Sequence, residues 1–277
     1  MKRYALRAFC LAGLLLWLPH MIFAAEPSPS VDQSAAEDKM ETNDVADPRN
    51  PAAIAELKRA TDFLASLPRF HIKSSVVYDV IQEDGRPLQF EKSGHLYLQR
   101  PDRFFAEIQF DDGRRRQYWY DGKMLSLAER SKNIYTRIKT PPTIDATLDM
   151  MEGLFKEPQP LADLFYSDLS PLERLAVKAD VVGDSRVLGR PCTHLSFRGK
   201  TVDWQIWVEK GAKPFIRKLA ISYREKSGSP QCVAVLDVWE TPDHFKDKLF
   251  KFTAPADSQW IDVLIPMPRR IEKGDQP

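Results

Sequence analysis

The chain has 277 residues, of which 43% are hydrophobic and 10% aromatic, so it holds enough apolar material for one large domain or two small ones. Its formal net charge is +1. Such a balance excludes bulk electrostatic attraction to polyanions as the basis of its function.

The first 25 residues are typical of a secretory signal peptide. Lys2, Arg3 and Arg7 form a basic start, Leu11–Phe23 is largely apolar, and Ala24-Ala25 offers a cleavage site. The alternative is an uncleaved membrane anchor, but the apolar run is shorter than the roughly 20 residues that a spanning helix needs. Cleavage leaves 37 basic against 39 acidic residues, a net charge of −2. The sequence therefore predicts an exported protein, for which no nucleic-acid partner is expected.

Residues 26–50 contain seven acidic and two basic residues and no aromatic one, which predicts a disordered acidic tether. The pair Asn50-Pro51 then introduces a helix. Its apolar residues recur at helical spacing from Ile54 to Leu67, until Pro68 ends it.

From Phe70 the apolar period changes to two, which is typical of half-buried strands. Asp112-Gly113 and Asp121-Gly122 are hairpin signals, and Gly183-Asp184 indicates a bulge or bend. Two helical segments, Ala146–Phe155 and Leu161–Tyr166, interrupt the strands. The eleven expected strands are His71–Ile81, Leu88–Gln99, Phe104–Phe110, Arg114–Tyr120, Lys123–Ala128, Ile134–Lys139, Ala176–Leu188, Thr193–Phe197, Val202–Glu209, Phe215–Tyr223 and Cys232–Trp239.

Consecutive strands within each run have no helix between them, so their pairing is expected to be antiparallel. The fold class that accounts for this order is mainly β with α: an open antiparallel half-barrel of about eleven strands, with helices covering its concave face. We expect a single domain over residues 51–266 and a flexible tail over residues 267–277.

Two cysteines remain after the signal peptide, Cys192 and Cys232. An exported chain favours a disulfide between them. The expected meander, however, places them three strands apart and at opposite ends, whereas bridged Cα atoms lie within about 7 Å. We therefore expect two free thiols.

No motif for catalysis or metal binding is visible. The histidines of the mature chain, His71, His95, His194 and His244, show no metal-ligand spacing, and there is no nucleophile elbow or P-loop. We interpret His194 as a hydrogen-bonded structural residue within a strand. No catalytic residue, metal or cofactor is predicted, and the alternative is an enzyme whose site assembles from distant residues.

Arg114-Arg115-Arg116 is the densest basic run. It indicates either a patch for lipid phosphates or an acidic partner, or a solvated hairpin face balanced by Asp111 and Asp112. Alternation places Arg115 on one face of the sheet and the other two arginines on the opposite face.

The segment Val202–Glu209 predicts which face holds a ligand. Alternation puts Val202, Trp204, Ile206 and Val208 on one face, and Trp207 with Asp203, Gln205 and Glu209 on the other. Because an unpaired carboxylate facing hydrocarbon is costly, we expect Trp204 and Ile206 on the concave, helix-facing side and Trp207 on the convex side, covered by a terminal segment. The candidate ligand contacts are Trp204, Ile206, Val208, Tyr118, Tyr120, Leu219, Ile221, Met151, Leu154 and Phe155; the alternative is that they are plain core.

Three stretches carry a resemblance to a known family: Arg190–Leu195, Val202–Val208 with its Trp-Gln-Ile-Trp centre, and Lys213–Leu219. They resemble a family of predicted periplasmic proteins, domain of unknown function 2092. The order of elements from about Asp47 to Ala256 is similar to that of the LolA/LolB-like lipoprotein carrier superfamily. The resemblance implies a LolA-like half-barrel whose lining holds acyl chains, with helices as a lid.

Together these observations predict a non-enzymatic, monomeric carrier or binding protein in the periplasm of a Gram-negative bacterium. Its ligand would be a lipid, a lipoprotein or another apolar molecule, held by burial of acyl chains. The alternative is a sensor or protein-interaction module that contacts an envelope protein through the same scaffold.

Overall fold

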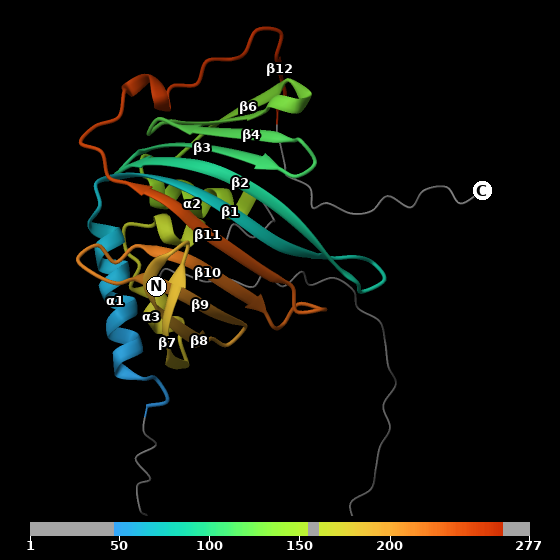
Figure 1. Cartoon of the computed structure of the whole chain (residues 1–277). Coiled ribbons are helices and arrows are strands. Elements are labelled where there is room, and N and C mark those ends of the chain that lie inside the picture. Colours follow the sequence, from blue (N-terminus) through green and yellow to red (C-terminus); the bar gives the residue numbers. More distant parts are fainter. Residues whose placement is uncertain (1–46, 155–160, 263–277) are drawn as a thin grey trace, which may run out of the picture. The chain divides into compact units, whose positions relative to one another are not determined.

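The computed structural model describes residues 47–154 and 161–262, in which strands are the commonest regular element (Figure 1). They form two consecutive runs in the chain. The first is β1 (Arg69–Ile81), β2 (Pro87–Gln99), β3 (Arg103–Phe110), β4 (Arg115–Tyr120), β5 (Met124–Glu129) and β6 (Ile134–Lys139). The second is β7 (Lys178–Val187), β8 (Arg190–Arg198), β9 (Val202–Glu209), β10 (Ile216–Tyr223) and β11 (Gln231–Glu240).

Local turn chemistry sets these hairpins. Gly113 and Gly122 have φ angles of +85° and +87°, which a residue with a Cβ adopts only with strain. Both Asp-Gly turns are where the sequence predicts them. The predicted irregularity in β7 is also confirmed, since the β7–β8 register shifts between Val181 and Gly183.

All strands in the described residues belong to one open sheet with the order β12-β6-β5-β4-β3-β2-β1-β11-β10-β9-β8-β7. The two meanders join where β1 pairs with β11, with Val76 opposite Ala234 and Tyr78 opposite Cys232. The short β12 (Gln259–Trp260) adds to β6 in parallel. The predicted fold class is confirmed, with twelve strands rather than eleven in the part of the chain that the structure describes, because a two-residue strand carries no periodic signal.

Helix α1 (Pro51–Ser66) begins at a defined cap. The side-chain oxygen of Asn50 accepts a hydrogen bond from the Ala52 amide at 2.9 Å, and Pro51 occupies the first turn. The Asn50 amide donates to the Ala179 carbonyl at 2.8 Å, so the helix start is tied to β7. The helix contacts β7, β8 and β9 through a fully buried stripe of Ala53, Leu57, Ala60 and Leu64.

A helical segment connects the two meanders: α2 (Ile144–Leu154), the 3-10 turn η2 (Ala162–Phe165) and α3 (Pro171–Leu175). In Figure 1, α2 lies behind the sheet. The Tyr120 hydroxyl donates to the Pro141 carbonyl at 2.7 Å, which ties the approach to α2 to β4. The predicted helical segment over Leu161–Tyr166 is confirmed as the single 3-10 turn η2.

The expectation of two free thiols is confirmed. Cys192 lies on β8 and Cys232 on β11, with β9 and β10 between them in the sheet, and both are free and buried. They also belong to different apolar clusters, one on each face.

None of the described helices is both long and apolar enough to span a bilayer. The predicted signal peptide, most of the predicted tether and the predicted C-terminal tail lie outside the described residues.

Candidate ligand-binding face

One face of the sheet forms a continuous apolar layer with the helices. Register places Trp204 of β9 between Phe197 of β8 and Ile221 of β10, and Ile206 between Leu195 and Leu219. These side chains belong to the same buried cluster as the apolar stripe of α1 and as Ile144 and Leu148 of α2. We call this side of the sheet the helix-lined face.

The face assignment of β9 agrees with the prediction. Trp204 is 3% exposed and stacks on Phe197 with ring centroids 5.3 Å apart. Trp207 belongs to a separate cluster with Val187 and Cys192, on the other side of the sheet, which we call the outer face.

We expected a terminal segment to cover Trp207, but its ring contacts among the described residues come from neighbouring strands. Its indole stacks on His194 at 4.1 Å between ring centroids, and the Lys218 ammonium lies 4.5 Å from its ring centroid. His194 also hydrogen-bonds to Gln205 at 2.8 Å, as expected of a structural histidine. Neighbours on β8 and β10 therefore cover this tryptophan, because long side chains in adjacent strands reach across the sheet surface.

Most of the predicted ligand contacts are on the helix-lined face but are nearly inaccessible. Tyr120 is completely buried and Tyr118 is 7% exposed, while Met151 is partly buried against the same cluster. Leu154, by contrast, is 37% exposed, and Phe155 lies outside the described residues. The other predicted contacts, all buried in the cluster, are Trp204, Ile206, Val208, Leu219 and Ile221.

Apolar side chains that remain partly accessible lie on the same face, at the C-terminal ends of β1 and β3 and at the N-terminal end of β2. This edge of the sheet is opposite the edge where β1 begins after α1 and where β6 ends before α2. Register places them side by side, since Tyr78 is opposite Phe90, and Lys92 is opposite Phe110. The half-buried apolar side chains in this region are Tyr78, Leu88, Phe90, Ile108 and Phe110. We call them the apolar end of the face.

Cations border the apolar end. The guanidinium groups of Arg114 and Arg116 lie 4.6 and 5.2 Å from the ring centroid of Phe110. The Lys92 ammonium lies 5.3 Å from the ring centroid of Tyr78. Such contacts keep a cation next to apolar surface, because the ring face carries partial negative charge. We call Lys92, Arg114 and Arg116 the rim cluster.

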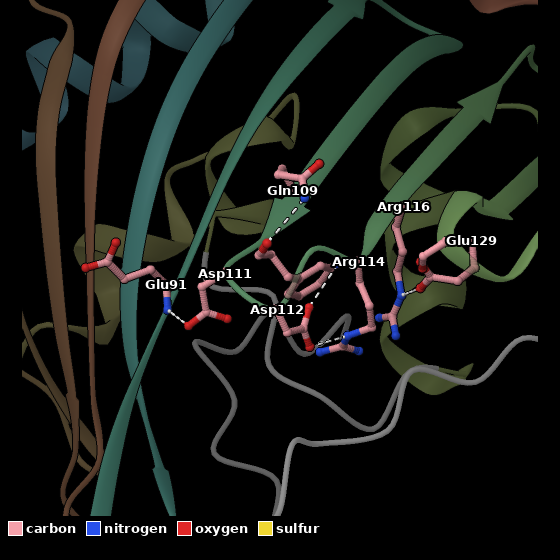
Figure 2. Close-up of polar contacts among 9 residues, drawn as sticks. Glu91, Gln109, Asp111, Asp112, Arg114, Arg116 and Glu129 are labelled. Atoms are coloured by element: carbon pink, nitrogen blue, oxygen red, sulfur yellow. Dashed lines mark hydrogen bonds and ion pairs between the residues drawn. The ribbon is translucent and has the colours of Figure 1, made fainter.

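Two carboxylates accompany the rim arginines (Figure 2). Arg114 Nε donates to Asp112 at 2.6 Å, and Arg116 Nε donates to Glu129 at 2.7 Å. The second pair is buried, with side chains 10% and 3% exposed. The predicted separation of the run is confirmed, because Arg115 pairs in register with Gln109 on the outer face.

The rim cluster was missed in the sequence because its members come from different strands. Arg114 and Arg116 are visible as a basic run, but Lys92 joins them only through the β2–β3 register. The sequence signal that could have found it is the alternation Leu88, Phe90, Lys92, which puts a lysine in an apolar row.

The connecting segment adds an acid to the helix-lined side. Burial, with a smaller contribution from the nearby Glu152 carboxylate, raises the pKa of Asp163 in η2 to about 7. Among the residues described, no group of three or more His, Cys, Asp and Glu side chains could hold a metal ion.

Solved structures with a similar fold have low sequence identity to this chain. The lipoprotein LppX of Mycobacterium tuberculosis is 11% identical, with a TM-score of 0.45 over 70% of this chain and 98% of that one. LprF of Mycobacterium bovis is 10% identical, with a TM-score of 0.46 over 76% and 100%. A LolA superfamily protein of Nitrosomonas europaea is 10% identical, with a TM-score of 0.33 over 72% and 97%. Likenesses at this level carry no argument about ligand or activity.

A search of curated proteins finds no match to the chain. One family model does match, over residues 53–264, which include every strand from β1 to β12. Its match extends over the helix-lined face, the rim cluster and the Trp-Gln-Ile-Trp segment. The chain therefore belongs to the family described as predicted periplasmic protein, DUF2092.

Proposed function

We propose that this protein is a non-enzymatic periplasmic carrier or binding protein that holds the acyl chain of a lipid or lipidated molecule against its helix-lined face. The observation that supports this most directly is the apolar end. There the apolar side chains of the helix-lined face stay half-buried, and Tyr78 and Ile108 pack against the buried cluster without being buried themselves.

The driving force would be apolar burial. Each CH₂ group removed from water contributes about 0.8 kcal/mol, so a single long chain supplies enough free energy for reversible binding without any specific polar contact. This fits a face on which Tyr78, Ile108 and Phe110 present mainly carbon atoms.

Native mass spectrometry of the protein extracted gently from the periplasm tests the proposal. We expect a co-purifying lipid at near-stoichiometric occupancy. Ile108→Ala should lower that occupancy, because Ile108 lies at the apolar end. Val77→Ala is the matched control, since Val77 is a half-buried aliphatic residue on the outer face, opposite Glu91 and Val233.

A protein recovered without lipid, and unable to take up a fatty acid in solution, would contradict the proposal. A protein that retains a stoichiometric protein partner after delipidation would instead favour a sensor or protein-interaction module on the same scaffold.

A further inference from the structure

We propose that the ligand is an anionic amphiphile, and that the rim cluster of Lys92, Arg114 and Arg116 holds its single acidic headgroup, a carboxylate or a phosphodiester; this rests on the function proposed above. The rim cluster and the apolar end are one continuous surface. Phe110 links them, because its ring contacts both arginines and its strand position is opposite Lys92.

Arg114 is the residue best placed to contact a headgroup. It binds Asp112 through Nε, and its two terminal nitrogens make no hydrogen bond to any described residue. The side chain is 25% exposed and lies over Phe110 on the helix-lined face. A guanidinium offers five donors in one plane, so one edge can bind the aspartate while the other binds a second acid.

Arg116 and Lys92 place further positively charged groups next to this contact. Arg116 is held by Glu129 within the sheet surface, which fixes its guanidinium beside Phe110. Burial raises the pKa of the Cys232 thiol to about 11, and the positive charge of the Lys92 ammonium offsets part of that rise. Two guanidinium groups beside the Phe110 ring and an ammonium group beside the Tyr78 ring therefore border the same apolar surface, which matches a chain ending in an acid.

The test compares three ligands with the same tetradecanoyl chain on the full exported chain. Tetradecanoic acid presents a carboxylate, lysophosphatidylglycerol a phosphodiester, and monotetradecanoylglycerol a neutral headgroup. We expect at least one acidic ligand to bind roughly tenfold more tightly than the neutral one, the effect of one partly exposed charge-assisted contact. The preference should shrink as salt is added.

Arg114→Gln and Arg115→Gln form a matched pair of variants, because they remove the same charge from adjacent residues on opposite faces. Arg114→Gln should reduce the preference for the acidic ligand to about twofold or less, since little of the charge-assisted contact remains. Its binding of the neutral ligand should not change, and Arg115→Gln should leave all three affinities unchanged.

Each remaining outcome is decisive. Equal binding of acidic and neutral ligands by the unmodified protein overturns this inference but leaves the carrier function standing, and it needs no variant. Binding of none of the three overturns both. An equal loss in Arg114→Gln and Arg115→Gln, or displacement of the acidic ligands by inorganic phosphate alone, assigns the effect to general charge or to a free-anion site and refutes the headgroup contact. The comparison of the two acidic ligands shows which headgroup is preferred.

Discussion

The two tryptophans of β9, Trp204 and Trp207, lie on opposite faces of the sheet because side chains alternate along a strand, and this gives them different roles. Trp204 is buried in the cluster that includes the helices, whereas Trp207 lies between His194 and Lys218 on the outer face. Both indoles are shielded from water, so burial alone does not distinguish them. Their surroundings do, because only Trp204 shares a face with the proposed ligand.

Trp204→Ala should destabilise the protein by about 3–5 kcal/mol, the range for truncating a buried large aromatic side chain. It should also lower lipid occupancy, since the layer against which the ligand packs would lose its support. Trp207→Ala should cost stability as well but leave occupancy nearly unchanged. Urea unfolding and native mass spectrometry measure the two effects separately. Loss of lipid in Trp207→Ala with retention in Trp204→Ala would reverse the assignment of faces.

At the scale of elements, the segment that connects the meanders carries ionisable groups toward the sheet. Asp163 of η2 acts electrostatically on Tyr223 of β10 and Tyr166, whose pKa values are raised mainly by burial, and Glu152 of α2 lies nearby. Tyr166 donates to Asp149 of α2 at 3.0 Å, which ties η2 to that helix. The protonation state of Asp163 should therefore affect the stability with which the connecting segment packs against the sheet.

Stability should fall as pH rises through the window set by Asp163. Its folded-state pKa of about 7 lies above its ordinary value of 3.8, so the folded protein binds this proton more tightly than the unfolded chain. The contribution is complete below about pH 4 and is lost toward pH 7, at no more than about 1.4 kcal/mol per pH unit. Asp163→Asn should flatten this dependence in urea unfolding, whereas Asp180→Asn, at an exposed position of β7, should keep it. An unchanged slope in Asp163→Asn would show that another group titrates.

At the scale of the whole molecule, the structure separates what local sequence signals specify from what they do not. Strand positions follow from alternation, and the hairpins follow from Asp-Gly turns, so β1–β11 were predictable within a few residues. The pairing of β1 with β11 was not, because it joins His71 to Glu240 and depends on the closure of a whole sheet. The same holds for the site. The face of Trp204 follows from alternation within one strand, whereas the rim cluster requires the register of three strands.

The residues after β11 illustrate a second long-range feature, the cover of the outer face. Tyr97, Phe105 and Trp119 form a row of neighbouring rings across β2, β3 and β4. Phe245 packs edge-on against Tyr97 at 5.7 Å, and Phe252 lies 5.1 Å from Trp119. The returning chain thus shields an aromatic row that the first meander would otherwise expose to water.

Ending the chain after Glu240 should therefore destabilise the first meander and expose this row. Phe250 is 1% exposed, so its loss alone is expected to cost about 3–5 kcal/mol. The shortened protein should bind a hydrophobic dye and unfold at lower urea concentration. A chain ended after Asp262 is the control, because it keeps Phe245, Phe250, Phe252 and the β12 pairing with β6. If both shortened chains matched the full chain in dye binding and stability, the segment after β11 would not be the cover that the aromatic contacts indicate.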